Sequence, residues 1–141
     1  MHPDSNIVLL LASSEGLFRT SDAGNNWQQV MSGAFQEIEF HPHLPNIVYA
    51  VKQVSNKTEF YKSTDDGLTF THKPNGWPVP AVAIDEQKRT EIAVSPADSN
   101  KIYALLTGAV GFVSGLYGIY VSNDAGENWS GLCCGAHLPN F

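Results

Sequence analysis

Positive charge is scarce in this sequence. Lysine and arginine together number 8, against 14 aspartates and glutamates, which gives a formal net charge of −6. The only arginines are Arg19 and Arg89. Nucleic-acid affinity rests on clustered lysines and arginines that neutralise phosphates. Because the sequence has no such cluster, we expect no nucleic-acid partner.

Long hydrophobic runs are also absent. The longest apolar stretch, NIVLLLA at residues 6–12, is far shorter than the ~20 residues that a membrane-spanning helix needs. It has no basic leader and no cleavage site, so it does not fit the pattern of a signal peptide. We therefore expect no membrane insertion, and we interpret the run as a buried strand.

Cysteine occurs only as the adjacent pair Cys133 and Cys134. Neighbouring cysteines bond to each other only through a strained ring, so we expect free thiols or partners outside this chain. No stretch shows a sustained helical period, whereas 12 glycines and 8 prolines indicate many turns. The sequence therefore predicts an all-β protein of about the size of one domain.

What the sequence does contain is a repeated segment. It reads TSDAGNNW at residues 20–27, STDDGLTF at 63–70 and SNDAGENW at 122–129. Each copy has Ser or Thr first, Asp third, Gly fifth, Asn or Thr seventh, and Trp or Phe eighth. We call these segments boxes 1, 2 and 3. Repetition in one order indicates an architecture built from similar units.

A second repeated element precedes each box. Residues 41–51 and 95–105 share a proline, a short polar turn, an asparagine and an apolar run, and residues 2–10 carry a related version. Each unit then predicts four short strands, A to D in chain order, which are rich in Ile, Val, Tyr and Phe and bounded by turn residues. The expected strands are 7–12, 16–20 and 27–31 in the first unit, 37–41, 47–52, 59–63 and 69–73 in the second, and 91–95, 102–107, 118–122 and 128–132 in the third.

Each box is expected to form the hairpin turn between strands C and D. Its aspartate can accept hydrogen bonds from its own turn, its glycine allows positive φ, and its aromatic residue can lie under the loop. The residues with these structural roles are Thr20, Asp22, Gly24, Trp27, Ser63, Asp65, Gly67, Phe70, Ser122, Asp124, Gly126 and Trp129. A calcium loop needs more acids and a glutamate at its twelfth position, so we expect no metal and no cofactor.

The boxes resemble the Asp-box, or BNR, repeat of sialidases, two-propeller xyloglucanases, photosystem assembly factors and ten-bladed sortilin-type propellers. The segments EIAVSPADSNKIYALL and GLYGIYVSNDAGENW are most similar to sortilin-like propeller proteins secreted by Bacteroidetes. The resemblance implies that each four-stranded antiparallel unit is one blade of a β-propeller and that the boxes are structural. It also implies an extracellular or cell-surface location.

Under this resemblance the chain holds about two and three-quarter blades. The expected divisions are blade 1 (strands B to D) at 1–31, blade 2 at 32–73, an insertion at 74–90, blade 3 at 91–132, and a lead-in to the next blade at 133–141. Propellers usually have at least four blades. We therefore expect either a fragment of a larger propeller, which we favour, or copies that close a ring. The partners are then the remaining blades of the same protein or further copies of the chain.

Binding is expected on the face opposite the boxes. The two long insertions, 74–90 and 107–117, are D–A and B–C connections, which share that face, and long individual loops commonly carry function. The candidate residues for binding a protein or glycan ligand are Trp77, Asp85, Arg89, Phe112 and Tyr117. Alternatively, Trp77 and Phe112 fill gaps between blades.

No residue is predicted to be catalytic. Two arginines cannot form the arginine triad of a sialidase. A glycosidase of the xyloglucanase kind needs two carboxylates that flank a cleft; Asp85 and Glu86 are available, whereas Asp98 lies on the wrong face. The HPH segment at 41–43 and His72 offer imidazoles for a metal site, but no further ligand lies at a spacing typical of such sites. We expect a non-catalytic binding or structural module, the alternative being part of a glycoside hydrolase whose acids lie mostly outside this chain.

Overall fold

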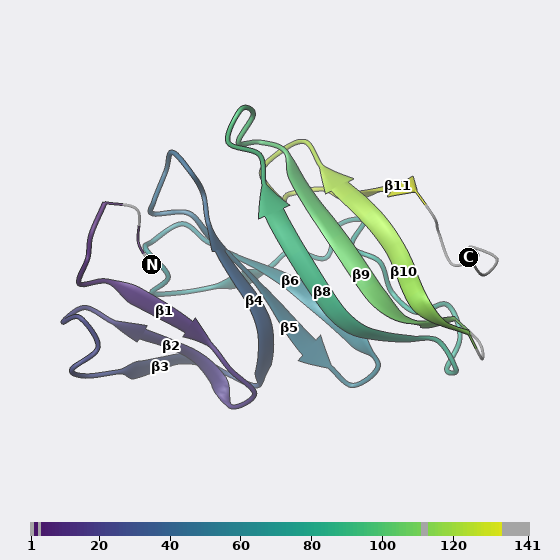
Figure 1. Ribbon diagram of the computed structural model, residues 1–141, viewed down its shortest axis with the longest axis horizontal. Coiled ribbons are helices and arrows are strands. Elements are labelled where there is room, and N and C mark those ends of the chain that lie inside the picture. The colour runs from purple at the N-terminus through teal and green to yellow at the C-terminus, as the bar shows by residue number, and fades with distance from the viewer. Residues whose placement is uncertain (1, 3, 111–112, 134–141) are drawn as a thin grey trace.

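The computed structural model describes residue 2 and residues 4–110 and 113–133, and in this part of the chain every regular element is a β-strand. The strands form three antiparallel sheets, which we call sheets I, II and III (Figure 1). Sheet I contains β1 (Leu9–Ala12), β2 (Gly16–Thr20) and β3 (Gln28–Ser32). Sheet II contains β4 (Ala34–Phe40), β5 (Val48–Val54), β6 (Lys57–Ser63) and β7 (Thr71–His72). Sheet III contains β8 (Glu86–Val94), β9 (Ile102–Val110), β10 (Val113–Ser122) and β11 (Ser130–Cys133).

The all-β prediction is confirmed, and every predicted strand overlaps an observed one. In each sheet the strands pair in chain order. No helix in the described residues is both long enough and apolar enough to cross a membrane.

The predicted insertions are partly strand rather than loop. Residues 107–110 continue β9, and Val113–Leu116 pair with them as part of β10. The first strand of sheet III starts at Glu86, inside the expected insertion 74–90. Gly108 permits this extension, because a Cβ at that position would collide with the backbone oxygen of Glu86. This strand extension was not predicted from the sequence, because the glycines of GAVGFVSG are typical of a loop.

The first repeat unit is shifted by one residue from the expected alignment, in which Asn6 matched Asn46. The register is set by the first box position, since Leu9 pairs with Thr20 just as Val48 pairs with Ser63. Ile7, not Asn6, therefore takes the place of Asn46. In each unit the backbone N–H of the fourth box residue donates a hydrogen bond to the backbone oxygen of the residue at this position. The donor and acceptor are Ala23 N and Ile7 O at 2.9 Å, Asp66 N and Asn46 O at 3.0 Å, and Ala125 N and Asn100 O at 2.8 Å.

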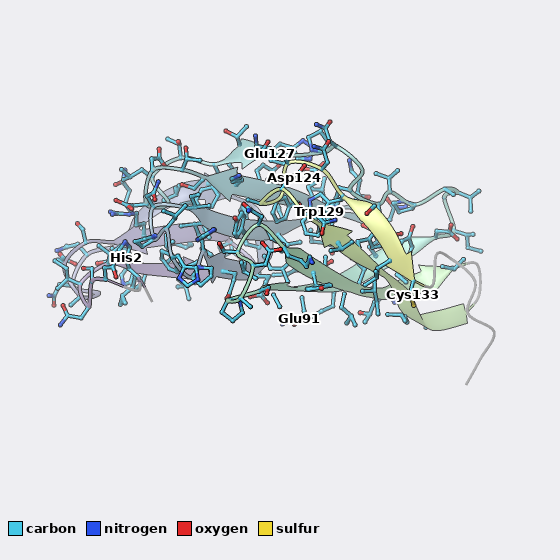
Figure 2. All side chains as sticks on the ribbon, turned by 90° about the horizontal axis from the view of Figure 1, so that it is seen from above. His2, Glu91, Asp124, Glu127, Trp129 and Cys133 are labelled. Carbon is cyan, nitrogen blue, oxygen red and sulfur yellow. The ribbon has the colours of Figure 1, made fainter. Side chains whose placement is uncertain are left out.

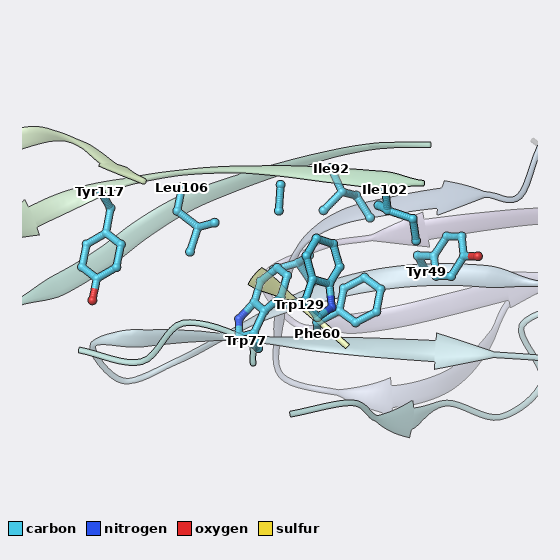
Figure 3. Packing of buried hydrophobic residues seen from close by; sticks show 10 residues of the cluster. Tyr49, Phe60, Trp77, Ile92, Ile102, Leu106, Tyr117 and Trp129 are labelled. Atoms are coloured by element: carbon cyan, nitrogen blue, oxygen red, sulfur yellow. The ribbon is translucent and has the colours of Figure 1, made fainter. Parts of the chain in front are cut away.

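Sheet II lies between the other two sheets, and each junction has its own core (Figure 1). Leu17, Phe35 and Ala50 form the buried centre between sheets I and II. The larger core lies between sheets II and III and contains Tyr49, Val51, Phe60, Trp77, Ile92, Ile102, Ala104, Leu106, Tyr117 and Trp129 (Figure 3). The molecule is therefore a stack of sheets in which the two end sheets each have one face without a neighbouring sheet among the described residues.

Candidate functional site

Box 3 is closed by one hydroxyl and one carboxylate. The Ser122 hydroxyl donates to Asp124 Oδ1 over 2.8 Å and accepts the backbone N–H of Gly126 at 2.9 Å. Asp124 Oδ1 also accepts the backbone N–H of Asn128, and Asp124 Oδ2 accepts the side-chain amide of Asn128, both at 2.8 Å. Both carboxylate oxygens are thus engaged within the hairpin itself.

Boxes 1 and 2 have the same network. In box 1, Asp22 Oδ1 accepts the Thr20 hydroxyl at 2.7 Å and the backbone N–H of Asn26 at 2.8 Å. In box 2 the seventh residue is Thr69, which gives its N–H to Asp65 Oδ1 at 2.9 Å and its hydroxyl to Asp65 Oδ2 at 2.6 Å. Asn and Thr are interchangeable at this position because each supplies a short side-chain donor.

The fourth and fifth box residues both adopt the left-handed conformation. In box 3, Ala125 has φ of 55° and Gly126 has φ of 85°. A Cβ on Gly126 would also lie 2.6 Å from Phe60 Cε1, and one on Gly67 would lie 2.8 Å from a Leu10 methyl carbon. Glycine is thus required in boxes 2 and 3 by conformation and by close packing on the preceding sheet.

Hydrogen bonds keep the box aspartates ionised. The side-chain amide of Asn26 and then the Thr20 hydroxyl lower the pKa of Asp22 to about 2. Burial alone would raise the pKa of Asp124, but the hydrogen bonds from Asn128 outweigh it, so the pKa lies below its usual value. Each aspartate therefore uses its negative charge to bind donors of its own turn, which is a structural role for a carboxylate.

The aromatic residue of the box is less exposed where a preceding sheet exists. Trp129 of box 3 is 6% exposed and packs against Phe60 of sheet II, with ring centroids 5.0 Å apart. Phe70 of box 2 packs on the core between sheets I and II. Trp27 of box 1 is 42% exposed. Trp27 does lie beside its own loop, since a Cβ on Gly24 would be 3.8 Å from its ring, but it stays partly exposed because no described residue forms a sheet in front of sheet I.

The candidate ligand residue Trp77 is not a surface platform. It is 6% exposed, its ring stacks on Phe60 at 5.3 Å, and its indole N–H donates to the backbone oxygen of Thr58 at 2.9 Å (Figure 3). Trp77 fills the gap between sheets II and III, as the alternative interpretation proposed. The sequence suggested exposure because Trp77 lies in a proline-rich loop, PNGWPVP.

The other candidate ligand residues are dispersed. Asp85 and Tyr117 are buried, at 4% exposure each, so neither side chain lies on the surface. Arg89 is exposed and donates from Nε to Glu91 Oε1 at 2.6 Å. Phe112 lies outside the described residues. The structure does not bring these side chains together into one surface site.

A buried polar network around Gln87 was missed by the sequence reasoning. Gln87 is 0% exposed, its Oε1 accepts the N–H of Thr58 at 2.7 Å, and its Nε2 donates to Pro78 O at 3.0 Å. Thr58 also meets Thr90 of sheet III, with hydroxyl oxygens 3.2 Å apart. The network fastens the loop that follows β7 to sheets II and III. A glutamine next to charged residues gave no signal of burial.

A carboxyl pair, Glu37 and Glu91, was also missed. Glu37 lies on β4 and Glu91 on β8, the contacting first strands of sheets II and III. Burial and a hydrogen bond with Glu91 raise the pKa of Glu37 to about 7. The bond from Glu37, with further help from Arg89, lowers the pKa of Glu91. Figure 2 shows Glu91 on the side of the molecule away from Asp124 and Glu127 of box 3. The signal was present, since EIEF and EIAV repeat at one spacing, so their glutamates occupy equivalent places in adjacent sheets.

This pair differs from the acid pair of a glycosidase in that its two carboxyls are hydrogen-bonded to each other. Carboxyl groups that share a hydrogen bond have oxygens about 2.5–2.7 Å apart. The two carboxyls of glycosidases stand about 5–9.5 Å apart, so that a glycosidic oxygen or a water fits between them. Of the acids considered earlier, Asp85 is buried and Glu86 pairs with Lys88 at 3.4 Å.

The histidines and the cysteine also have structural partners. His41 is 3% exposed, and its Nδ1 accepts the backbone N–H groups of His43 and Leu44 at 3.2 and 3.0 Å. His72 packs on Tyr61. No group of three or more potential metal ligands occurs in the described part of the chain. Cys133 is disulfide-bonded, which excludes a free thiol, one of the two alternatives expected for this residue, and Cys134 lies outside the described residues.

Comparison with known proteins places this architecture. No family model matches the chain, and no curated protein matches it. Among solved structures, an ancestral GH74 enzyme aligns with a TM-score of 0.65 and 17% identity over 92% of this chain and 17% of its own length. The GH74 enzyme of Niastella koreensis aligns with a TM-score of 0.53 and 14% identity over 93% of this chain and 28% of its own.

The chain has the fold of part of a β-propeller. At these identities the likeness concerns the fold alone. This propeller segment spans 17% and 28% of the lengths of the two enzymes.

Proposed function

We propose that this propeller segment is a non-catalytic module of an Asp-box protein, of the sortilin-like secreted kind, that contacts a partner through the face opposite the boxes. The box networks support this proposal because they engage their own aspartates. The Glu37–Glu91 pair supports it too, since these two carboxyls are hydrogen-bonded to each other. Such a module acts outside the cell or at its surface.

The observation that carries the binding part is an exposed apolar segment. In the connection between β7 and β8, Val79, Val82 and Ile84 are 63%, 57% and 47% exposed. The segment ends beside the β5–β6 turn, where the Asn56 side chain donates to Asp85 O at 3.0 Å. That turn lies at the opposite end of sheet II from box 2. Exposed apolar clusters of this kind mark contact surfaces for proteins, so a protein is favoured over a glycan.

A peptide-display experiment tests the proposal. Peptides selected on the 141-residue chain should lose at least about tenfold in affinity with Val82→Asp, because a buried apolar contact would be replaced by an unpaired charge. Leu44→Asp is the matched control, since Leu44 is similarly exposed, at 50%, but lies in the turn between β4 and β5. Peptide binding that is unchanged by Val82→Asp would contradict the proposal.

The second candidate is a part of a glycoside hydrolase whose catalytic residues lie outside this chain. The likeness to GH74 enzymes favours it at the level of fold. It predicts that xyloglucan oligosaccharides bind the chain and that binding is insensitive to Val82→Asp. Isothermal titration with such oligosaccharides therefore separates the two candidates.

A further inference from the structure

The two end sheets leave apolar faces uncovered. On sheet I, Leu11 is 48% and Trp27 is 42% exposed. On sheet III, Tyr103 is 40% and Leu105 is 41% exposed. Side chains alternate along a strand, so Tyr103 and Leu105 point away from sheet II, which their neighbours Ile102, Ala104 and Leu106 contact. The uncovered faces therefore belong to opposite ends of the stack.

The uncovered face of sheet I matches the faces by which sheets II and III contact the sheet before them. One equivalent position in the three sheets lies two residues before the first box residue. It is occupied by Phe18 in sheet I, Tyr61 in sheet II and Tyr120 in sheet III. Tyr61 packs on the core between sheets I and II, and Tyr120 on the core between sheets II and III. Trp27, Phe70 and Trp129 likewise share the last box position. Sheet I thus presents Phe18 and Trp27 where sheet III uses Tyr120 and Trp129 to dock on sheet II.

The uncovered face of sheet III matches the face of sheet II that receives this contact. Tyr103 pairs with Val121, and Leu105 with Ile119, in the same register in which Tyr49 pairs with Lys62 and Val51 with Phe60. Tyr49, Val51 and Phe60 form the sheet II side of the larger core. Sheet III therefore presents Tyr103, Leu105 and Ile119 in the positions of this receiving set.

The ion pair between sheets II and III has neutral equivalents on the two uncovered faces. Between sheets II and III, Lys62 Nζ binds Glu127 at 2.8 Å. On the uncovered faces the equivalent of Lys62 is Val121, and the equivalent of Glu127, the sixth box residue, is Asn25. Both members of the ion pair are replaced by neutral residues, so at these two positions the contact leaves neither a lysine nor a glutamate without its partner.

We propose that the sheet I face of one copy of this chain docks on the sheet III face of a second copy, repeating the contact between sheets II and III. The interface is heterologous, because it joins two different surfaces, and it forms a ring where the rotation closes. The interface is apolar at its centre, and high salt does not weaken it.

Two single-face variants test this. In sedimentation velocity over a concentration series, the wild-type chain should associate, whereas Trp27→Lys and Leu105→Lys should each stay monomeric. A mixture of the two variants should form a 1:1 heterodimer that does not grow, because one variant keeps the sheet III face and the other keeps the sheet I face. Leu44→Lys, away from both faces, should associate like the wild type.

Three results would overturn the proposal: a wild-type chain that is monomeric at every concentration, a mixture of the two variants that stays monomeric, or a single variant that forms homodimers. Circular dichroism confirms that each variant is folded. If one variant of the first pair does not fold, Leu11→Lys and Tyr103→Lys form a second pair on the same two faces. This test is independent of the peptide-display test, since none of these residues lies in the Val79–Ile84 segment.

Discussion

At the third position of each box, one carboxylate accepts hydrogen bonds from two backbone or side-chain donors of its own hairpin and from the hydroxyl at the first position. The arrangement needs an ionised acceptor with two oxygens, which Asp supplies and Asn does not. It explains why the first, third and seventh positions recur together. The second, fourth and sixth side chains take no part in this network, and they vary among the boxes.

Asp65→Ala is therefore expected to destabilise the chain by about 1–3 kcal/mol, because it leaves the Thr69 N–H and the Ser63 hydroxyl without their acceptor. The control is Asp66→Ala, which installs the residue that boxes 1 and 3 carry at that position and is expected to cost less than about 0.5 kcal/mol. Urea unfolding of both variants measures the difference. Equal stabilities for the two variants would contradict the structural role of Asp65.

Glu37 is expected to make stability depend on pH. Its pKa is about 7 in the folded chain, against a usual value of 4.5, because burial and Glu91 favour its protonated form. A carboxyl with a raised folded-state pKa contributes stability that is complete below its unfolded pKa and is lost as the pH rises through the folded pKa. The wild type should therefore lose stability between about pH 5 and pH 8.

Glu37→Gln should remove part of that loss, because the amide stays neutral. The urea midpoint of the variant should therefore increase relative to the wild-type midpoint as the pH rises. In a chain that already carries Glu91→Gln, the same substitution should have a smaller effect, since the two side chains interact directly. A pH profile that Glu37→Gln leaves unchanged would show that the two carboxyls do not share a proton.

At the scale of strands and loops, the repeats predicted most of the fold. Strand positions were readable because turn residues bound each apolar run, and the boxes fixed the hairpins. The burial of Trp77 was not readable, since it depends on Phe60 and Trp129, which are distant in sequence. The exposure of Trp27 was not readable either, because box 1 has the same local sequence signals as box 3 and differs only in what lies in front of it.

Gln87 has the largest expected effect on the connection between β7 and β8. Gln87→Leu keeps the approximate volume but leaves the Thr58 N–H and the Pro78 carbonyl unpaired in a buried site. Each unpaired group costs about 1–3 kcal/mol. Thermal unfolding measures the loss, and Lys88→Leu at the exposed neighbouring position is the matched control. A loss no greater than that of the control would mean that water replaces the glutamine in this site.

At the scale of the whole molecule, protection of the backbone should follow the order of the sheets. In β5, Val48, Tyr49, Ala50 and Val51 are all 0% exposed, because sheet II has a neighbour on each face. Among the described strands β1 pairs only with β2, at the edge of a sheet whose other face is uncovered. Local opening is easiest where few apolar contacts must be broken.

Hydrogen exchange followed by mass spectrometry should therefore show slower exchange in peptides from β5 than in peptides from β1. Raising the protein concentration should slow exchange in β1–β3 and in β9–β10, because docking of copies covers those faces, and should leave β5 unchanged. In Leu105→Lys the concentration dependence should disappear from both regions. If β1 is as protected as β5 in the dilute wild-type chain, a covering that comes from within the same chain protects sheet I, and the contact between copies is not what stabilises it.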